Sequence, residues 1–191
     1  IPERVRGTLS GRKQVQGGLA TKSDVAFFNT QVPAALVSNI LRNQRYVLCT
    51  DITPLQYDSM AEQYGHTPDK KGMLASYKHS VNVRIFQRAL YVLPWSNWVG
   101  NSLIDDYGVS RERIRVVPPG VDMNVWQPGQ SEQAQKDGRV KLLFVGGDLY
   151  RKGGALLIDA FRKLPPNSAE LILVTRSAIE EEPGITVRND L

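Results

Sequence analysis

The sequence predicts an α/β protein in which the strands of parallel sheets alternate with helices. Short apolar runs, typical of buried parallel strands, are separated by longer segments whose apolar residues recur at helical spacing. The predicted strands are 24–29, 46–50, 90–93, 113–117, 140–145, 171–175 and 185–187. This alternation favours parallel sheets covered by helices on both faces.

The clearest long helix is predicted at 72–88. Met73, Tyr77, Val81 and Ile85 recur every four residues and form one apolar stripe. Alternating β-branched residues in the second half of the segment leave a strand open as an alternative.

A second helix is expected after Ser96, whose side chain can cap it. Its buried side would hold Val99, Leu103 and Tyr107, and Gly108 would stop it. Further helices are predicted at 33–41 and 154–164, the latter with Leu157, Ala160, Phe161 and Leu164 on one face. The glycine-rich, basic segment 1–22 is expected to be a loop.

Composition and charge narrow the class of protein. The chain has 191 residues, of which 41% are hydrophobic and 23% charged, a globular composition that excludes disorder. The net charge of +5 is spread along the chain, which suits a phosphorylated substrate or an anionic membrane face and does not indicate nucleic acid. Cys49 is the only cysteine, so a reducing compartment is expected. We therefore expect a cytoplasmic protein, with a peripheral membrane contact on the inner face left open.

The polar stretch 124–138 suggests a boundary between two units. We expect a partial first domain at 1–122, a link at 123–138, and the start of a second domain at 139–191. Because the chain begins at Ile1 and stops at Leu191 directly after a strand-like segment, we interpret it as a fragment.

Residues 145–154, VGGDLYRKGG, carry the strongest functional signal. They follow a predicted strand and open a helix, where backbone N–H groups and the helix dipole attract an anion. Gly146 and Gly147 allow close approach of a ligand, and Arg151 and Lys152 add positive charge, so the segment suits a diphosphate. The alternative is a glycine-rich turn with two solvated cations. The segment matches neither the P-loop nor the G-x-G-x-x-G pattern.

Two stretches carry a family resemblance: SNWVGNSLIDDYGVSRERIRVVPPGVD at 96–122 and VKLLFVGGDLYRKGGALLIDAFRKL at 140–164. In this order they resemble glycosyltransferase family 4. The resemblance implies a GT-B fold, with two Rossmann-like doubly wound parallel sheets facing a cleft, both incomplete here. It also implies a retaining hexosyltransferase-like enzyme that moves a sugar from a nucleotide-diphosphate sugar to the hydroxyl of a carbohydrate or lipid-linked acceptor.

The same resemblance suggests roles for individual residues. Gly146, Gly147, Arg151, Lys152 and Gly153 would bind the donor phosphates, with Lys152 and Arg151 stabilising the leaving group. Many members carry an arginine where this chain has Gly147, which we interpret as a subgroup trait.

On the acceptor side, the resemblance points to Thr50, Asp51 and Thr53 at the end of the second predicted strand. Asp51 matches the aspartate of the family's His-Asp pair, whereas Thr50 stands in place of the histidine. Alternatively, Asp51 and Thr53 only shape the turn before Pro54.

Other chemistry finds little support. His66 and His79 have no partners at metal-ligand spacing, so neither a metal nor a cofactor is expected. The three tryptophans are expected in core or interdomain packing: Trp95, Trp98 and Trp126. Three cations could face a membrane or simply be solvated: Lys78, Arg84 and Arg88.

The family's paired glutamates, separated by seven residues, have no match in this sequence, since Glu180, Glu181 and Glu182 are adjacent. We therefore expect the segment alone to be inactive. Two alternatives remain: another GT-B enzyme such as a sugar-nucleotide epimerase, and a non-catalytic GT-B partner subunit.

Overall fold

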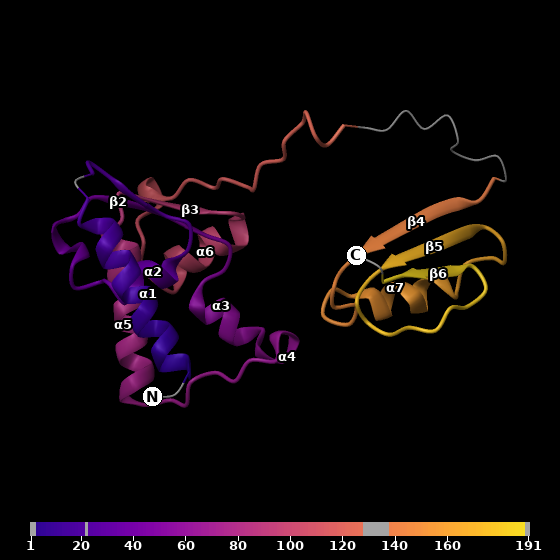
Figure 1. The fold of residues 1–191 in the computed structure, drawn as a ribbon, viewed down its shortest axis with the longest axis horizontal. Helices are drawn as coiled ribbons and strands as arrows, with labels where there is room; N and C mark the ends of the chain where they lie inside the picture. Colours follow the sequence, from indigo (N-terminus) through magenta and orange to yellow (C-terminus); the bar gives the residue numbers. More distant parts are fainter. Residues whose placement is uncertain (1–2, 22, 128–137, 190–191) are drawn as a thin grey trace. The chain divides into compact units, whose positions relative to one another are not determined.

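The computed structural model describes residues 3–21, 23–127 and 138–189, with side chains described from residue 9 onward. The chain divides into two compact units, Ile1–Val121 and Asp122–Leu191 (Figure 1). Of the expected link 123–138, the part at 128–137 lies outside the described residues.

The first unit is built on a parallel sheet in the order β1-β2-β3. The strands are β1 (Ala26–Phe28), β2 (Tyr46–Thr50) and β3 (Tyr91–Pro94). Their register places Phe28, Leu48 and Val92 side by side, and all three are buried. These three residues form the side of the hydrophobic core that the sheet provides.

The helices of the first unit add buried residues to that core. They are α1 (Glu3–Leu19), α2 (Gln31–Leu36), α3 (Pro54–Ser59), α4 (Ala61–Tyr64), α5 (Met73–Arg88) and α6 (Asn97–Asp105), with short 3₁₀ turns at Leu41–Asn43 and Arg111–Arg113. Buried residues of α2, α5 and α6 pack against the strands in one cluster. On the other face of the sheet Phe27 is 62% exposed. Within the described residues, helices therefore cover one face of this sheet, not both as the pattern predicts.

Two helix predictions in this unit are confirmed. Segment 73–88 is helical, so its strand alternative is wrong; Val81 and Ile85 are buried, whereas Met73 and Tyr77 are exposed. The stripe thus reaches the core only in the second half of α5. The helix after Ser96 also forms, and the Ser96 side chain accepts a hydrogen bond from the Val99 N–H.

The predicted loop at 1–22 is wrong, because residues 3–19 form α1. Its glycines do not prevent a helix since tertiary contacts stabilise it: Val15 and Leu19 pack against the core. Near Gly11 the side chain of Leu36 comes within 3.4 Å of the position a Cβ would take, so a small residue suits the contact between α1 and α2.

The predicted strand at 113–117 is also wrong, although the segment runs beside β3. The N–H groups of Arg115 and Val117 donate to the carbonyls of Val92 and Pro94, and only an isolated bridge forms at Ile114. Pro118 and Pro119, which have no N–H groups to donate, follow at once and limit the pairing. Of the two positions expected for the tryptophans, the core is wrong as well, because Trp95, Trp98 and Trp126 are 38%, 51% and 70% exposed, and packing between domains stays a prediction.

The second unit has a parallel sheet in the order β4-β5-β6 with one helix. Its elements are β4 (Val140–Val145), α7 (Gly154–Phe161), β5 (Ala169–Val174) and β6 (Ile185–Arg188), which lie together in Figure 1. Leu171 and Leu173 of β5 are buried against Ile158 of α7, whereas Leu143 and Val145 on the other face are exposed. The predicted face of α7 is partly wrong, since Ala160 and Leu164 are exposed while Ile158 is buried.

Among the described residues, no helix combines the length and the apolar character that crossing a bilayer requires. Of the three cations considered for a membrane contact, Lys78 forms an ion pair with Asp69 at 2.5 Å.

Two buried tyrosines predict that the first unit loses stability at alkaline pH. Burial raises the pKa of Tyr46 and of Tyr107 to about 12, and the Tyr46 hydroxyl donates to the Ile85 carbonyl at 2.6 Å. Between the unfolded value near 10 and this folded value, the unfolded chain binds fewer protons, so stability is full below pH 10 and falls toward pH 12. Each tyrosine would contribute a loss of up to about 3 kcal/mol.

This dependence can be measured by urea unfolding at several pH values between 8 and 12. The variant Tyr46→Phe should flatten the slope, whereas Tyr77→Phe, whose ring is exposed, should leave it unchanged. A slope that is the same in all three proteins would contradict the assignment.

Candidate functional site

The glycine-rich loop lies at the carboxyl end of β4 and is held against the end of β5. The Gly146 N–H donates to the Val174 carbonyl at 2.9 Å, and the Arg176 N–H donates to the Gly147 carbonyl at 3.3 Å. Ligands of open α/β sheets bind at this edge, outside the carboxyl ends of the strands.

Asp148 organises the turn that follows the two glycines. Its carboxylate accepts a hydrogen bond from the Arg151 N–H at 3.1 Å and pairs with the Arg151 guanidinium at 3.5 Å. Its carbonyl accepts from the Lys152 N–H at 3.1 Å. The cations at 151 and 152 therefore sit on a turn of defined shape that leads directly into α7.

At Gly153 and Gly154, the last two residues of the loop, the local geometry favours glycine. Gly153 has φ +79°, a left-handed conformation that L side chains rarely adopt. A Cβ on Gly154 would lie 2.4 Å from Cγ of Leu149, whose side chain is buried and whose N–H donates to the Ser177 hydroxyl at 3.2 Å. These two residues let the chain pass closely over Leu149 as α7 begins.

The loop folds back so that Lys152 lies against the end of β4. A Cβ on Gly146 would come within 3.3 Å of the Lys152 Cβ and 3.0 Å of the Phe144 ring. Lys152 is exposed, and no carboxylate of the described residues forms an ion pair with it. Arg151 differs, because the carboxylate of Asp148 partly neutralises it.

The structure thus brings the five predicted phosphate-site residues together in one loop of the second unit. It also adds a residue that the sequence analysis missed. The guanidinium of Arg176, from the segment after β5, lies over Gly147. A signal was present, since Arg176 directly follows the predicted strand 171–175 and the carboxyl ends of neighbouring parallel strands share one edge.

The acceptor-side candidates lie in the first unit, at the end of β2. Asp51 is exposed, whereas Thr50 and Thr53 are fully buried. The Thr50 hydroxyl lies 2.9 Å from the side-chain oxygen of Gln31, to which it can donate. Thr53 caps α3 in a reciprocal pair of hydrogen bonds with Gln56.

A network of hydrogen bonds fixes Thr53 further. Its hydroxyl lies 2.8 Å from the hydroxyl of Ser102, which donates to the Asp106 carboxylate at 2.6 Å. These contacts favour the turn-shaping interpretation for Thr53. Of the three candidates, Asp51 has the side chain that is accessible to a ligand.

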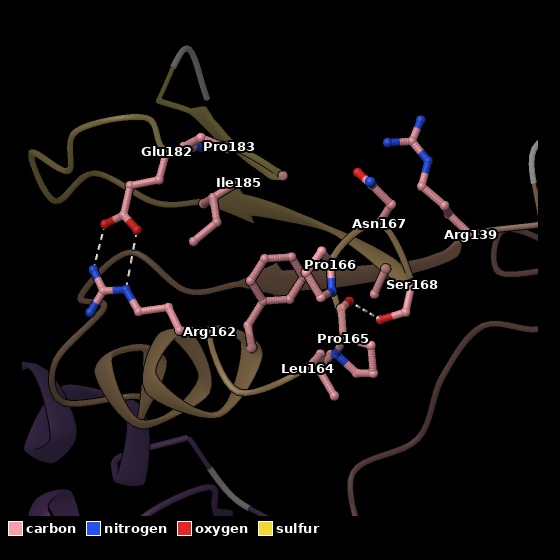
Figure 2. Close-up of a pocket in the computed structure, with 13 residues that line it drawn as sticks. Arg139, Arg162, Leu164, Pro165, Pro166, Asn167, Ser168, Glu182, Pro183 and Ile185 are labelled. Carbon is pink, nitrogen blue, oxygen red and sulfur yellow. Dashed lines mark hydrogen bonds and ion pairs between the residues drawn. The ribbon is translucent and has the colours of Figure 1, made fainter.

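The cavity shown in Figure 2 lies at the opposite edge of the second sheet. It measures about 350 Å³ and is lined by residues at the amino ends of the strands, among them Arg139, Ser168 and Ile185. On its rim Arg162 and Glu182 form a two-pronged ion pair. This pair lowers the pKa of Glu182, and the cavity contains none of the loop residues.

In the part of the chain that the structure describes, no three His, Cys, Asp or Glu side chains lie close enough together to hold a metal ion. His66 instead contacts the carboxylate of Asp58 at 2.8 Å. The ring of His79 packs near that of Tyr107.

Comparison with known proteins yields a family match. The model of Glycosyltransferase Family 4 matches residues 19–125, more than half of the chain. The D-inositol 3-phosphate glycosyltransferase of Acidothermus cellulolyticus is 48% identical over 64 residues, which are 30% of this chain and 14% of that protein. A probable sucrose-phosphate synthase of Thermosipho melanesiensis is 30% identical over 84 residues, 44% of this chain and 20% of that protein.

Solved structures of low sequence identity share the fold. The sucrose-phosphate synthase of Thermosynechococcus elongatus matches all of this chain with a TM-score of 0.65 at 15% identity, over 52% of its own length. Anabaena HepE in complex with UDP matches 86% of this chain with a TM-score of 0.59 at 23% identity, over 42% of its own length. The chain therefore spans about half the length of these proteins. The α/β fold class with two parallel sheets is confirmed by the described strands and by these relatives.

Proposed function

Because this chain belongs to glycosyltransferase family 4, we propose that it is part of an enzyme that moves a sugar from a nucleotide-diphosphate sugar to an acceptor hydroxyl, with retention of configuration. The observation that carries the proposal is the loop at the carboxyl end of β4. It combines two glycines, the start of α7 and the exposed cation Lys152. Such an arrangement is suited to phosphate oxygens.

The chemistry of the transfer explains why cations are needed there. As the bond between the sugar's anomeric carbon and the phosphate oxygen breaks, negative charge grows on the departing diphosphate. A cation held in place beforehand stabilises that charge more in the transition state than in the ground state. Lys152 is the main candidate for this role. Arg151 supports it and is oriented by Asp148.

The proposal extends to the donor, the acceptor and the cofactor. HepE, which shares the fold, binds UDP-glucose, and this supports a nucleotide sugar as donor. We assign the acceptor, a carbohydrate or a lipid-linked saccharide, to the first unit near Asp51, which is exposed. Side-chain cations, with no metal ion, would neutralise the diphosphate. A lipid-linked acceptor would entail a peripheral membrane contact.

The described chain is proposed to need the remainder of its parent protein for turnover. It spans only about half the length of the solved relatives, and it carries no paired-glutamate motif. The 191-residue piece is therefore expected to be inactive on its own.

The proposal predicts that nucleoside diphosphates stabilise the full-length protein. At a concentration 100 times its Kd, the correct nucleoside diphosphate should add about 2.7 kcal/mol to the free energy of unfolding, and the nucleoside alone much less. Thermal unfolding with UDP, GDP, ADP, CDP and TDP, each paired with its nucleoside, measures this. Release of the diphosphate from the matching nucleotide sugar, in the presence and absence of EDTA, then tests transfer.

Two results would contradict the proposal. Failure of every nucleoside diphosphate to stabilise the protein would remove the donor site. Stabilisation without any transfer to a panel of carbohydrate acceptors would instead favour a non-catalytic binding subunit.

A further inference from the structure

The second unit places a basic side chain outside the glycine-rich loop directly on that loop. Arg176 follows β5, and its N–H donates to the Gly147 carbonyl at 3.3 Å. Three guanidinium atoms, Nε, Cζ and Nη2, lie 3.5, 3.7 and 3.7 Å from the position that a Cβ on Gly147 would take. Both the backbone and the guanidinium of Arg176 thus lie beside Gly147.

The backbone conformation at position 147 does not require a glycine. It lies outside the left-handed region that favours glycine, unlike Gly153 in the same loop. The atoms nearest to its missing Cβ belong to Arg176. A Cβ at 147 would lie in ordinary van der Waals contact with the guanidinium, so the space beside this glycine is occupied by Arg176.

Basic residues flank the two glycines. The Cβ of Lys152, from the segment that leads into α7, lies beside Gly146, and the guanidinium of Arg176, from the segment after β5, lies beside Gly147. Arg176 is exposed, and among the described residues no carboxylate forms an ion pair with it. The one acidic side chain in the loop, Asp148, pairs with Arg151.

Among the described residues neither Lys152 nor Arg176 forms an ion pair with a carboxylate, so both positive charges can interact with a bound anion. Arginine presents a planar fork of N–H donors that can grip two oxygens of one phosphate, whereas lysine offers a compact charge.

We propose that Arg176 is a phosphate-binding residue that contacts the donor's diphosphate from the β5 side of the loop while Lys152 contacts it from the α7 side. This assignment rests on the proposed function of the loop. The diphosphate would then be bound at the carboxyl ends of two strands, β4 and β5. The site would include Arg176 in addition to the segment 146–153.

The test uses the full-length protein and the nucleoside diphosphate that stabilises it most. Isothermal titration gives the Kd of this diphosphate and of its nucleoside for the wild type, for Arg176→Ala and for Arg176→Gln. Glutamine keeps much of the packing on Gly147 and removes the charge. Arg111→Ala, at an exposed arginine of the first unit, serves as the matched control.

Both Arg176 variants should bind the diphosphate roughly tenfold more weakly than the control, with the nucleoside unaffected. Diphosphate binding within about twofold of the control in either variant would overturn the role of Arg176. An equal loss of nucleoside binding would also overturn it, because the contact would then lie elsewhere on the ligand. If the wild type binds no nucleoside diphosphate at all, the proposed function fails, which is a different result.

Discussion

Replacing Lys152 with alanine in the full-length protein is expected to lower kcat for sugar transfer by roughly 100-fold to 1,000-fold, the cost of losing one group that stabilises developing charge. Lys152 is exposed and its Cβ lies beside Gly146 at the end of β4, so its side chain is accessible to a ligand at this edge. No carboxylate of the described residues competes for it.

If Lys152 has the proposed role, the loss should appear in kcat more than in KM, because the negative charge on the diphosphate increases as the bond to phosphate breaks. Steady-state kinetics with the matching nucleotide sugar measure both constants. Lys163→Ala, at an exposed lysine just after α7, is the control and should retain wild-type kinetics. A Lys152→Ala enzyme with an unchanged kcat would show that the loop is a solvated turn.

The sequence was most informative where local signals and tertiary packing agree. Ser96 offers a capping hydroxyl, and Val99 and Leu103 are buried on the helix that follows, so the pattern alone located α6 and its buried side. Tyr107 is also buried, but it lies just beyond the end of the helix. The strand β4 likewise begins and ends where its apolar run does.

Prediction failed where long-range contacts decide the structure. The glycines of α1 suggested a loop, yet Val15 and Leu19 have apolar partners in the core that no local pattern reveals. Segment 113–117 has strand composition, but whether it pairs depends on the neighbouring strand and on the prolines that follow.

The same limit applies to the site. The glycine-rich loop is contiguous in sequence, so its residues could be predicted together. Arg176 lies 29 residues after Gly147, and only the pairing of β4 with β5 brings the two into contact. On the acceptor side, the spacing could not show that Thr53 is buried and capping a helix while Asp51 is exposed.

Phe86→Ala is expected to destabilise the first unit by about 3–5 kcal/mol, a large part of the 5–15 kcal/mol that typically holds a domain folded. Phe86 lies on α5 and is fully buried, and its ring meets that of Tyr107 edge-on with centroids 5.0 Å apart. The truncation would leave a cavity where α5, α6 and the sheet meet, and it would remove the aromatic contact. The substitution would also disturb the packing of Tyr107, whose hydroxyl accepts a hydrogen bond from the Leu55 N–H at the start of α3.

The matched control is the same substitution at the exposed Phe27 of β1, which should cost less than about 1 kcal/mol because little of its surface is removed from water. Urea unfolding can be followed by the fluorescence of Trp95 and Trp98, both in the first unit. Trp95 reports directly on the sheet, since its ring N–H donates to the Cys49 sulfur on β2 at 3.0 Å. Equal losses for the two phenylalanines would mean that the core does not lie on the α5 face of the sheet. A much larger loss at Phe86 would place the stability of this unit in the layer between α5, α6 and the strands, where the buried residues of these elements form one cluster.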